Sequence, residues 1–189
     1  MRIQRGKESG YSLAELLVVV AIVGVMSLVS VPQFIKYQQT AKIKGALRIL
    51  ASDVRNARQV AIARYIQVRI EFTTNSRYKF SYRTVGASSW TPMPISILTN
   101  PSIPMTVTPI QAYRDMPDPM TFSANTFGDL DGNGKADIVF NSDGTITNPD
   151  TTLSGGTVTI TSPWTSLPNN QMVISIASSG GVTSTASHS

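Results

Sequence analysis

The stretch GYSLAELLVVVAIVGVMSLVSVPQFI, residues 10–35, decides the architecture of this 189-residue chain. Between Leu16 and Val31, only two serines interrupt a run of apolar or small residues. With its flanks, the run is long enough to cross a hydrocarbon layer of about 30 Å, which takes ~20 helical residues. The sequence therefore predicts a membrane-spanning helix over residues 11–35, kinked or locally unwound at Pro32.

The segment in front of this run is polar and basic. Residues 1–10 read MRIQRGKESG and carry three cations and one acid. Basic residues beside a membrane span hold that side in the cytoplasm, so the rest of the chain is expected outside it. A secretory signal would be cut after the apolar run, near Ser30, and that alternative stays open. Its apolar region would be only ~7–15 residues long, however.

Glu15 stands almost at the start of the apolar run. A carboxylate in mid-bilayer costs about 2.5–3.5 kcal/mol by insertion scales, and such acids usually have a partner. The alternative is that Glu15 lies among the lipid headgroups and needs none.

Residues 10–22, GYSLAELLVVVAI, closely resemble the class III signal of type IV prepilins and pseudopilins. The resemblance implies cleavage by prepilin peptidase between Gly10 and Tyr11, and N-methylation of Tyr11. It also implies that Glu15 is the glutamate used in assembly. Two positions depart from the family pattern: Tyr11 stands where phenylalanine is usual, and Ala14 where a larger aliphatic residue is common.

The resemblance to pilins implies that the chain first lies in the inner membrane as a single-pass protein with a periplasmic head, and then joins a filament. Its partners would be prepilin peptidase, other pilin or pseudopilin subunits, an inner-membrane assembly platform and membrane lipid. The new α-ammonium at Tyr11 would pair with the Glu15 carboxylate of a neighbouring subunit. Two charges desolvated together cost far less than either one alone.

Residues 36–66 are expected to continue as an amphipathic helix. Apolar residues recur there at steps of three and four from Ile43 to Ala61, which indicates one buried face. An intracellular coiled coil would explain these steps but not residues 11–35. The basic side chains of this segment are candidates for lipid headgroups, acidic neighbouring subunits or DNA: Lys36, Lys42, Lys44, Arg48, Arg55, Arg58 and Arg64.

Residues 67–183 are predicted to form a β-rich head, and residues 184–189 a frayed tail. Alternating segments at 68–72 and 78–83 indicate a hairpin, and further short strands are expected at 138–140, 145–146, 157–161 and 172–177. The segment 86–127 is expected to be rich in loops. The fold class is therefore α+β, with a long N-terminal helix packed on a mostly antiparallel sheet, the pilin fold.

A narrower resemblance covers the head. Residues 55–62 with the strand at 68–72, residues 138–140 with Gly144, and residues 173–176 with Gly181 are similar to the GspH/FimT family. This implies a minor pilin or pseudopilin of a type IV pilus or a type II secretion system. The alternatives are a major pilin, or a membrane-anchored DNA- or ligand-binding protein that does not polymerise. The resemblance also implies that DNA-binding members carry arginines in the C-terminal region. No arginine follows Arg114 here, so DNA binding is disfavoured.

One loop has the spacing of a calcium site. Residues 129–137 read DLDGNGKAD, with oxygen donors at the first, third, fifth and ninth places: Asp129, Asp131, Asn133 and Asp137. The terminal glutamate of an EF-hand is missing, since Phe140 stands at its place. Structural calcium is the favoured interpretation, and a solvated turn is the alternative.

Composition argues against an enzyme. The chain has no cysteine and a single histidine, His188, so neither a thiol nor a histidine-based triad is expected. Asp115 and Asp118 are the nearest approach to an acid–base pair, and nothing distinguishes them from ordinary loop acids. Residues 1–83 hold 14 of the 16 basic and 4 of the 11 acidic residues, which points to a basic element that meets a surface or partner.

Overall fold

The computed structural model describes residues 11–102, 104–105, 113–130, 132, 134, 136–147, 155–168 and 170–187. The leader with Gly10, the loop residues Asp131 and Asn133, and residues 188–189 lie outside this set. The chain divides into two compact units, residues 1–39 and residues 40–189, and each is described by itself.

Helix α1 runs from Leu13 to Arg64, 52 residues, and contributes to both units. It joins the two predicted helical segments, with Pro32 inside it, and the kink predicted there stays a prediction. The helix ends where Tyr65 takes a left-handed backbone conformation, with φ of 56°. The Tyr65 N–H closes the last turn by donating to the Ile62 carbonyl over 3.3 Å.

The larger sheet of the head has the strand order β3-β2-β1-β6-β7, and β4 also pairs with β2. Its strands are all paired antiparallel. Their bounds are Ile66–Thr74 (β1), Arg77–Thr84 (β2), Thr91–Pro92 (β3), Tyr113–Asp115 (β4), Asp137–Phe140 (β6) and Ile146–Thr147 (β7). The predicted hairpin is confirmed as β1 and β2. The loop-rich segment also contains a short helix, α2 (Ser96–Thr99).

The smaller sheet has the order β10-β9-β8-β5, again antiparallel. Its strands are Thr121–Asn125 (β5), Gly156–Thr161 (β8), Gln171–Ile176 (β9) and Val182–Ser187 (β10). The sheets meet where the Ile146 N–H donates to the Ser178 carbonyl over 2.9 Å. The prediction of a frayed tail from residue 184 is wrong for residues 184–187, because β10 pairs with β9 from Val182 to Ser187.

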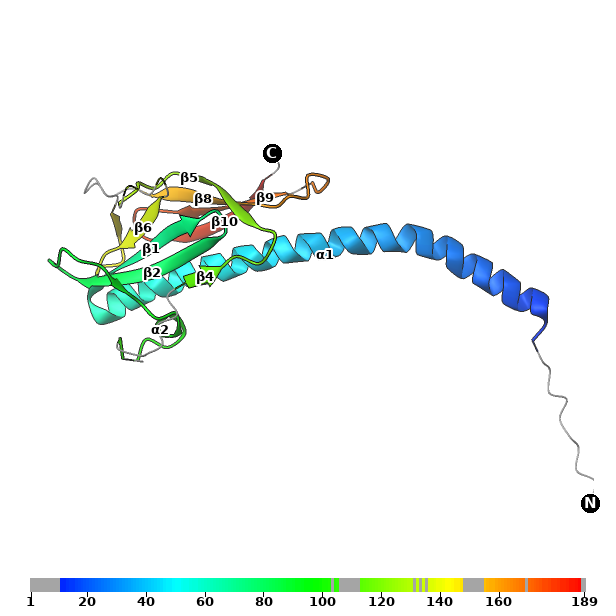
Figure 1. Ribbon diagram of the computed structural model, residues 1–189, viewed down its shortest axis with the longest axis horizontal. Coiled ribbons are helices and arrows are strands. Elements are labelled where there is room, and N and C mark those ends of the chain that lie inside the picture. Colours follow the sequence, from blue (N-terminus) through cyan, green and yellow to red (C-terminus); the bar gives the residue numbers. More distant parts are fainter. Residues whose placement is uncertain are drawn as a thin grey trace, which may run out of the picture. The chain divides into compact units, whose positions relative to one another are not determined.

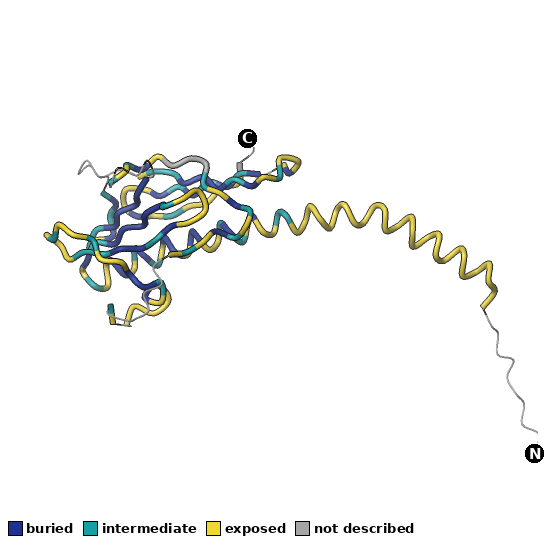
Figure 2. Tube along the Cα trace, in the orientation of Figure 1, coloured by how far each residue is buried: buried dark blue, intermediate teal, exposed yellow. Residues whose placement is uncertain are grey.

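The head is held by one apolar core between α1 and the sheets, which confirms the predicted α+β class. Figure 1 shows the second half of α1 running along the strands, and Figure 2 shows buried residues recurring on that half. Aromatic rings of β1, β2 and β5 pack against one another, and the edge-on pair Phe72 and Phe122 has 4.7 Å between its ring centroids. The buried helical residues are Ile43, Ala46, Leu50, Ala51, Asp53, Val54, Ala57, Val60 and Ala61.

Candidate functional site

The described chain begins at the start of α1. Tyr11 is 84% exposed, and the Ser12 carbonyl accepts the N–H groups of Glu15 and Leu16 at 3.0 and 3.2 Å. Glu15 therefore lies in the first helical turn, where the helix dipole favours a negative charge. Its carboxylate is exposed and has no ion-pair partner among the residues that the structure describes. The geometry leaves Glu15 available to another molecule.

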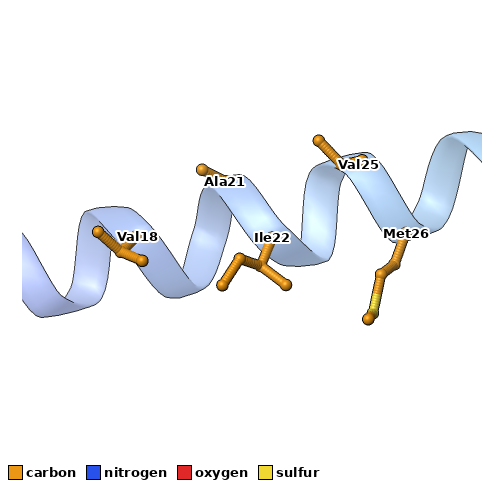
Figure 3. A pocket seen from close by; sticks show the side chains of 5 residues that line it. All are labelled: Val18, Ala21, Ile22, Val25 and Met26. Carbon is orange, nitrogen blue, oxygen red and sulfur yellow. The ribbon is translucent and has the colours of Figure 1, made fainter.

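The first half of α1 is apolar around its whole circumference. Its most apolar 18-residue window has a mean hydropathy of 2.5, and none of that window is buried. Figure 3 shows Val18, Ala21, Ile22, Val25 and Met26 lining one shallow apolar depression. Their spacing is that of residues that meet a second helix. An all-round apolar helix belongs in a membrane or in the core of an assembly.

The two serine hydroxyls inside this apolar segment are satisfied within the helix. The Ser27 hydroxyl donates to the Val23 carbonyl over 2.7 Å, and the Ser30 hydroxyl to the Met26 carbonyl over 2.9 Å. Pro32 has no N–H, so the carbonyl four residues before it receives no helical bond from that position. Both serines are therefore compatible with an environment that contains no water.

The second half of α1 is locked to the head by a buried acid. Asp53 is 5% exposed, accepts a 2.8 Å hydrogen bond from the Tyr78 hydroxyl, and forms a 2.6 Å ion pair with Arg114. Burial raises the pKa of Asp53 above its ordinary value of 3.8, although Tyr78 and Arg114 oppose that shift. Burial, with the nearby Asp53 charge, also raises the pKa of Tyr78. Helix, β2 and β4 thus share one polar contact inside the core.

Three arginines of α1 are bound to head carbonyls. Arg58 donates to Gly144 and Ser179 at 2.9 and 3.0 Å, Arg55 contacts Val182 at 3.4 Å, and Arg64 contacts Pro101. Three of the seven basic residues predicted as candidates for a partner therefore contact the head of the same chain. Lys42 lies beside Trp164, with its ammonium 5.9 Å from the ring centroid.

The calcium prediction falls on a loop that is only partly described. Both oxygens of Asp129 accept backbone N–H groups, from Gly132 at 2.9 Å and Gly134 at 2.7 Å. Asp137 is 1% exposed, accepts the Leu130 N–H at 2.9 Å and pairs with Arg69 at 3.0 Å. The carboxylates of Asp129 and Asp137 thus already hold the loop through protein donors, and the structure does not test calcium binding.

One member of the candidate acid–base pair, Asp115, forms an ion pair. The Asp115 carboxylate pairs with Arg77 at 2.5 Å and is 63% exposed. The hydrogen bond from Arg77 lowers the pKa of Asp115, which opposes a role as a proton donor near neutral pH.

Sequence reasoning missed the buried charges of the head. Arg69 and Glu71 alternate with apolar residues in β1, a pattern typical of a strand with one solvated face, yet they are 5% and 3% exposed. The one sequence signal that could have indicated a cover over these charges is Trp90, a large aromatic residue 19 residues after Glu71. Asp53 and Arg58 carried no local signal, because their partners lie 25 to 121 residues away in the chain.

Comparison with known families gives two matches. The family described as type II transport protein GspH matches residues 46–180, and the prokaryotic N-terminal methylation motif matches residues 5–31. The second match contains Gly10, Tyr11 and Glu15. A search of curated proteins found no match.

The arrangement of helix and sheets agrees with that of a solved structure. The minor pseudopilin EpsH from the type 2 secretion system of Vibrio cholerae is 12% identical, with a TM-score of 0.52, over 77% of this chain and 97% of that chain. The type IV minor pilin FimU of Pseudomonas aeruginosa is 13% identical over 81% and 98%, with a TM-score of 0.49. At such identities, the EpsH likeness supports the arrangement of helix and sheets and nothing finer.

Proposed function

Because this chain belongs to the GspH family of type II transport proteins and carries the N-terminal methylation motif, it is a minor pilin or pseudopilin subunit, and we propose how it is processed and assembled. Prepilin peptidase cuts between Gly10 and Tyr11 and methylates the Tyr11 amine. The apolar half of α1 then anchors the subunit in the inner membrane until it enters a filament. Its head is periplasmic, and its work is assembly rather than catalysis.

Glu15 is the residue that sets the register of assembly. Cleavage creates an ammonium at Tyr11, four residues before a carboxylate that has no ion-pair partner among the described residues. Tyr11 precedes α1, which begins at Leu13, so the helix does not hold the new ammonium against Glu15, and the ammonium of one subunit is free to meet the carboxylate of the next. Pairing removes the cost of holding an isolated carboxylate in an apolar environment. The exposed Glu15 at the tip of an unburied apolar helix is the observation that carries the proposal.

The apolar half of α1 supplies the contact area. Its side chains are exposed within the described chain and have the i, i+3, i+4, i+7, i+8 spacing shown in Figure 3. In the bilayer these side chains contact lipid or the helices of an assembly platform. In a filament they contact the helices of neighbouring subunits. Leaving the membrane therefore exchanges one apolar environment for another, so little hydrophobic free energy is lost.

The experiment has two parts, done with the full chain in its own host. Mass spectrometry of the mature protein is expected to show a methylated N-terminus at Tyr11. The Glu15→Gln variant, which keeps the shape and removes the charge, is expected to stay in the membrane fraction while its amount in sheared filaments falls at least tenfold. Glu15→Asp, which keeps the charge, is the matched control and should retain more of the incorporation.

Either part can defeat the proposal. An intact first ten residues, or a start near Val31 after the apolar run, would contradict processing at Gly10. Normal incorporation of Glu15→Gln would show that the charge has no part in assembly. A mature Tyr11 terminus with no filament in which the protein is found would favour a membrane-anchored protein that does not polymerise.

A further inference from the structure

The outer face of the β1–β2 hairpin carries a buried network of charges. Arg69 Nη2 lies 3.1 Å from Glu71 Oε2 and 3.0 Å from Asp137 Oδ2. The other Glu71 oxygen, Oε1, lies 2.6 Å from Lys79 Nζ. Arg69, Glu71 and Asp137 are 5%, 3% and 1% exposed, so three charges are held almost entirely out of water. The hairpin register explains the grouping, because Glu71 faces Lys79 and Arg69 faces Ser81.

A tryptophan covers this network. The Arg69 guanidinium lies 5.9 Å and the Arg83 guanidinium 4.5 Å from the Trp90 ring centroid. The chain after Trp90 forms β3, in which Pro92 is the register partner of Ser81. A cavity of about 160 Å³ remains between the sheet and this cover. It is lined by Trp90, by Pro92 of the neighbouring strand β3, and by five residues of β1 and β2: Arg69, Glu71, Lys79, Phe80 and Ser81.

The cavity has hydrogen-bond donors to spare. Ser81 is 4% exposed, and its hydroxyl has no hydrogen-bond partner among the residues that the structure describes. Both Glu71 oxygens are already occupied by cations, whereas the Lys79 ammonium has further hydrogens to donate. Among the charged residues that line the cavity, Arg69 and Lys79 outnumber the one acid, Glu71, by one positive charge. The missing partner is therefore an acceptor, and preferably an anion.

We propose that this cavity is a carboxylate-binding site. One carboxylate oxygen accepts from the Ser81 hydroxyl and the other from the Lys79 ammonium, while the Trp90 ring excludes bulk water. The volume equals roughly five water molecules, which fits a carboxylate with one or two attached carbons and excludes a nucleotide. The occupant is the end of an acidic side chain, a chain-terminal carboxylate, or a small free acid. These three sources share one chemistry, and the experiment separates them.

The two tryptophans make the site readable in the intact protein. In full-length Trp164→Phe in detergent micelles, all tryptophan emission comes from Trp90. Sodium acetate, N-acetyl-glutamate amide and a short neutral peptide with a free C-terminus are titrated at constant ionic strength, beside acetamide. A saturable change in emission is expected at roughly millimolar carboxylate, as small ligands allow, and none with acetamide. Whichever of the three carboxylates binds most tightly identifies the source.

Ser81→Ala, made in the Trp164→Phe background, tests whether the Ser81 hydroxyl binds the carboxylate or only a trapped water molecule. Because its hydroxyl has no described partner, its removal should leave the melting temperature unchanged or raised, while carboxylate affinity falls at least fivefold. Ser166→Ala, at an exposed serine of the β8–β9 segment, is the matched control and should bind as before. The proposal is overturned if no carboxylate gives a saturable response, if acetamide binds equally, or if Ser81→Ala retains full affinity.

Discussion

At the scale of single residues, Arg58 is the side chain that ties α1 to two turns of the head by hydrogen bonds. Its guanidinium donates to carbonyls in two different turns, at Gly144 and Ser179. Both turns contain a glycine with a left-handed backbone, Gly144 with φ of 81° and Gly180 with φ of 80°. A charged donor shared between two carbonyls is among the stronger hydrogen-bonding arrangements in a protein. The close approach of Arg58 is possible because neither glycine has a Cβ.

Gly180→Ala is therefore expected to destabilise the head by more than about 2 kcal/mol, since it combines an unfavourable φ with a steric clash. A Cβ at Gly180 would overlap the Gly144 carbonyl oxygen and the Arg58 side chain. Chemical denaturation of the two proteins measures the difference. The neighbouring Gly181→Ala is the control, because its Cβ would have contacts no closer than 3.8 Å. Equal stabilities for the two variants would contradict the close packing described at Gly180.

Asp53 makes the stability of the head depend on pH. Its pKa is raised by burial above 3.8, so the folded chain holds that proton more tightly than the unfolded chain does. The stabilisation from protonated Asp53 is complete below pH ~3.8 and is lost as the pH rises through the raised value. The pKa values of exposed Asp115 and Asp143 are lowered instead. The stability that these two residues contribute is therefore complete above pH ~3.8 and is lost as the pH falls below it.

As the pH rises from 3.8 toward 7, the melting temperature of the wild type is expected to fall relative to that of Asp53→Asn. The asparagine resembles the protonated acid and cannot ionise, so it lacks this part of the pH dependence. Calorimetry at several pH values gives the comparison. Asp143→Asn, at an exposed turn residue, is the control. A difference that does not vary with pH would show that Asp53 titrates normally in the folded head.

At the scale of elements, the two halves of α1 have the same conformation but differ in what they pack against. Both halves are helical, yet the first half buries no side chain and the second half buries nine. Strand β10 shows the reverse relation between composition and structure. Its sequence, VTSTAS, has little apolar content, and it is ordered as an edge strand by its pairing with β9. Edge strands tolerate such polar composition because one side faces solvent.

The loop between β5 and β6 is the element for which calcium binding remains our proposal. Added calcium is expected to raise the melting temperature of the head by a few degrees, because an ion bound only to the folded state stabilises it. The rise should vanish in Asp131→Ala and persist in Asp143→Ala. Differential scanning fluorimetry with calcium and with magnesium measures it. Without any calcium-dependent shift, the loop is a turn held by Asp129, and by Asp137 with its partner Arg69.

At the scale of the whole molecule, folding and assembly use separate parts of the chain. The first residue with a buried side chain in the described chain is Ile43, so the apolar half of α1 contributes nothing to the core of the head. The boundary between the two compact units falls just before it, at Gln39 and Thr40. A subunit can therefore remain folded while its apolar helix changes surroundings.

A chain that starts at Thr40 is expected to fold in the absence of detergent and to melt within about 5 °C of the full chain in detergent, since no core contact is lost. A chain that starts at Leu50 is the control. It loses buried Ile43 and Ala46 and should be destabilised by at least ~3 kcal/mol. Circular dichroism during heating measures both. If the chain from Thr40 fails to unfold cooperatively, the membrane segment is needed for folding.

Much of the fold could be read from local patterns. The length of the apolar run, the acid at its start and the steps of three and four after Pro32 each depend on neighbouring residues only, and they predicted the helix, its two halves and the hairpin that follows. The methylation motif is equally local, and the family match over residues 5–31 agrees with it.

Only the tertiary structure decided which partner each long-range group takes. Arg58 meets carbonyls 86 and 121 residues away, Tyr78 meets Asp53 across 25 residues, and Arg69 meets Asp137 across 68. Local sequence determines which conformations a segment prefers, because those preferences come from its own backbone and its nearest neighbours. The partner of a buried charge is selected by the packing of the whole core, where leaving any one charge unpaired is too costly.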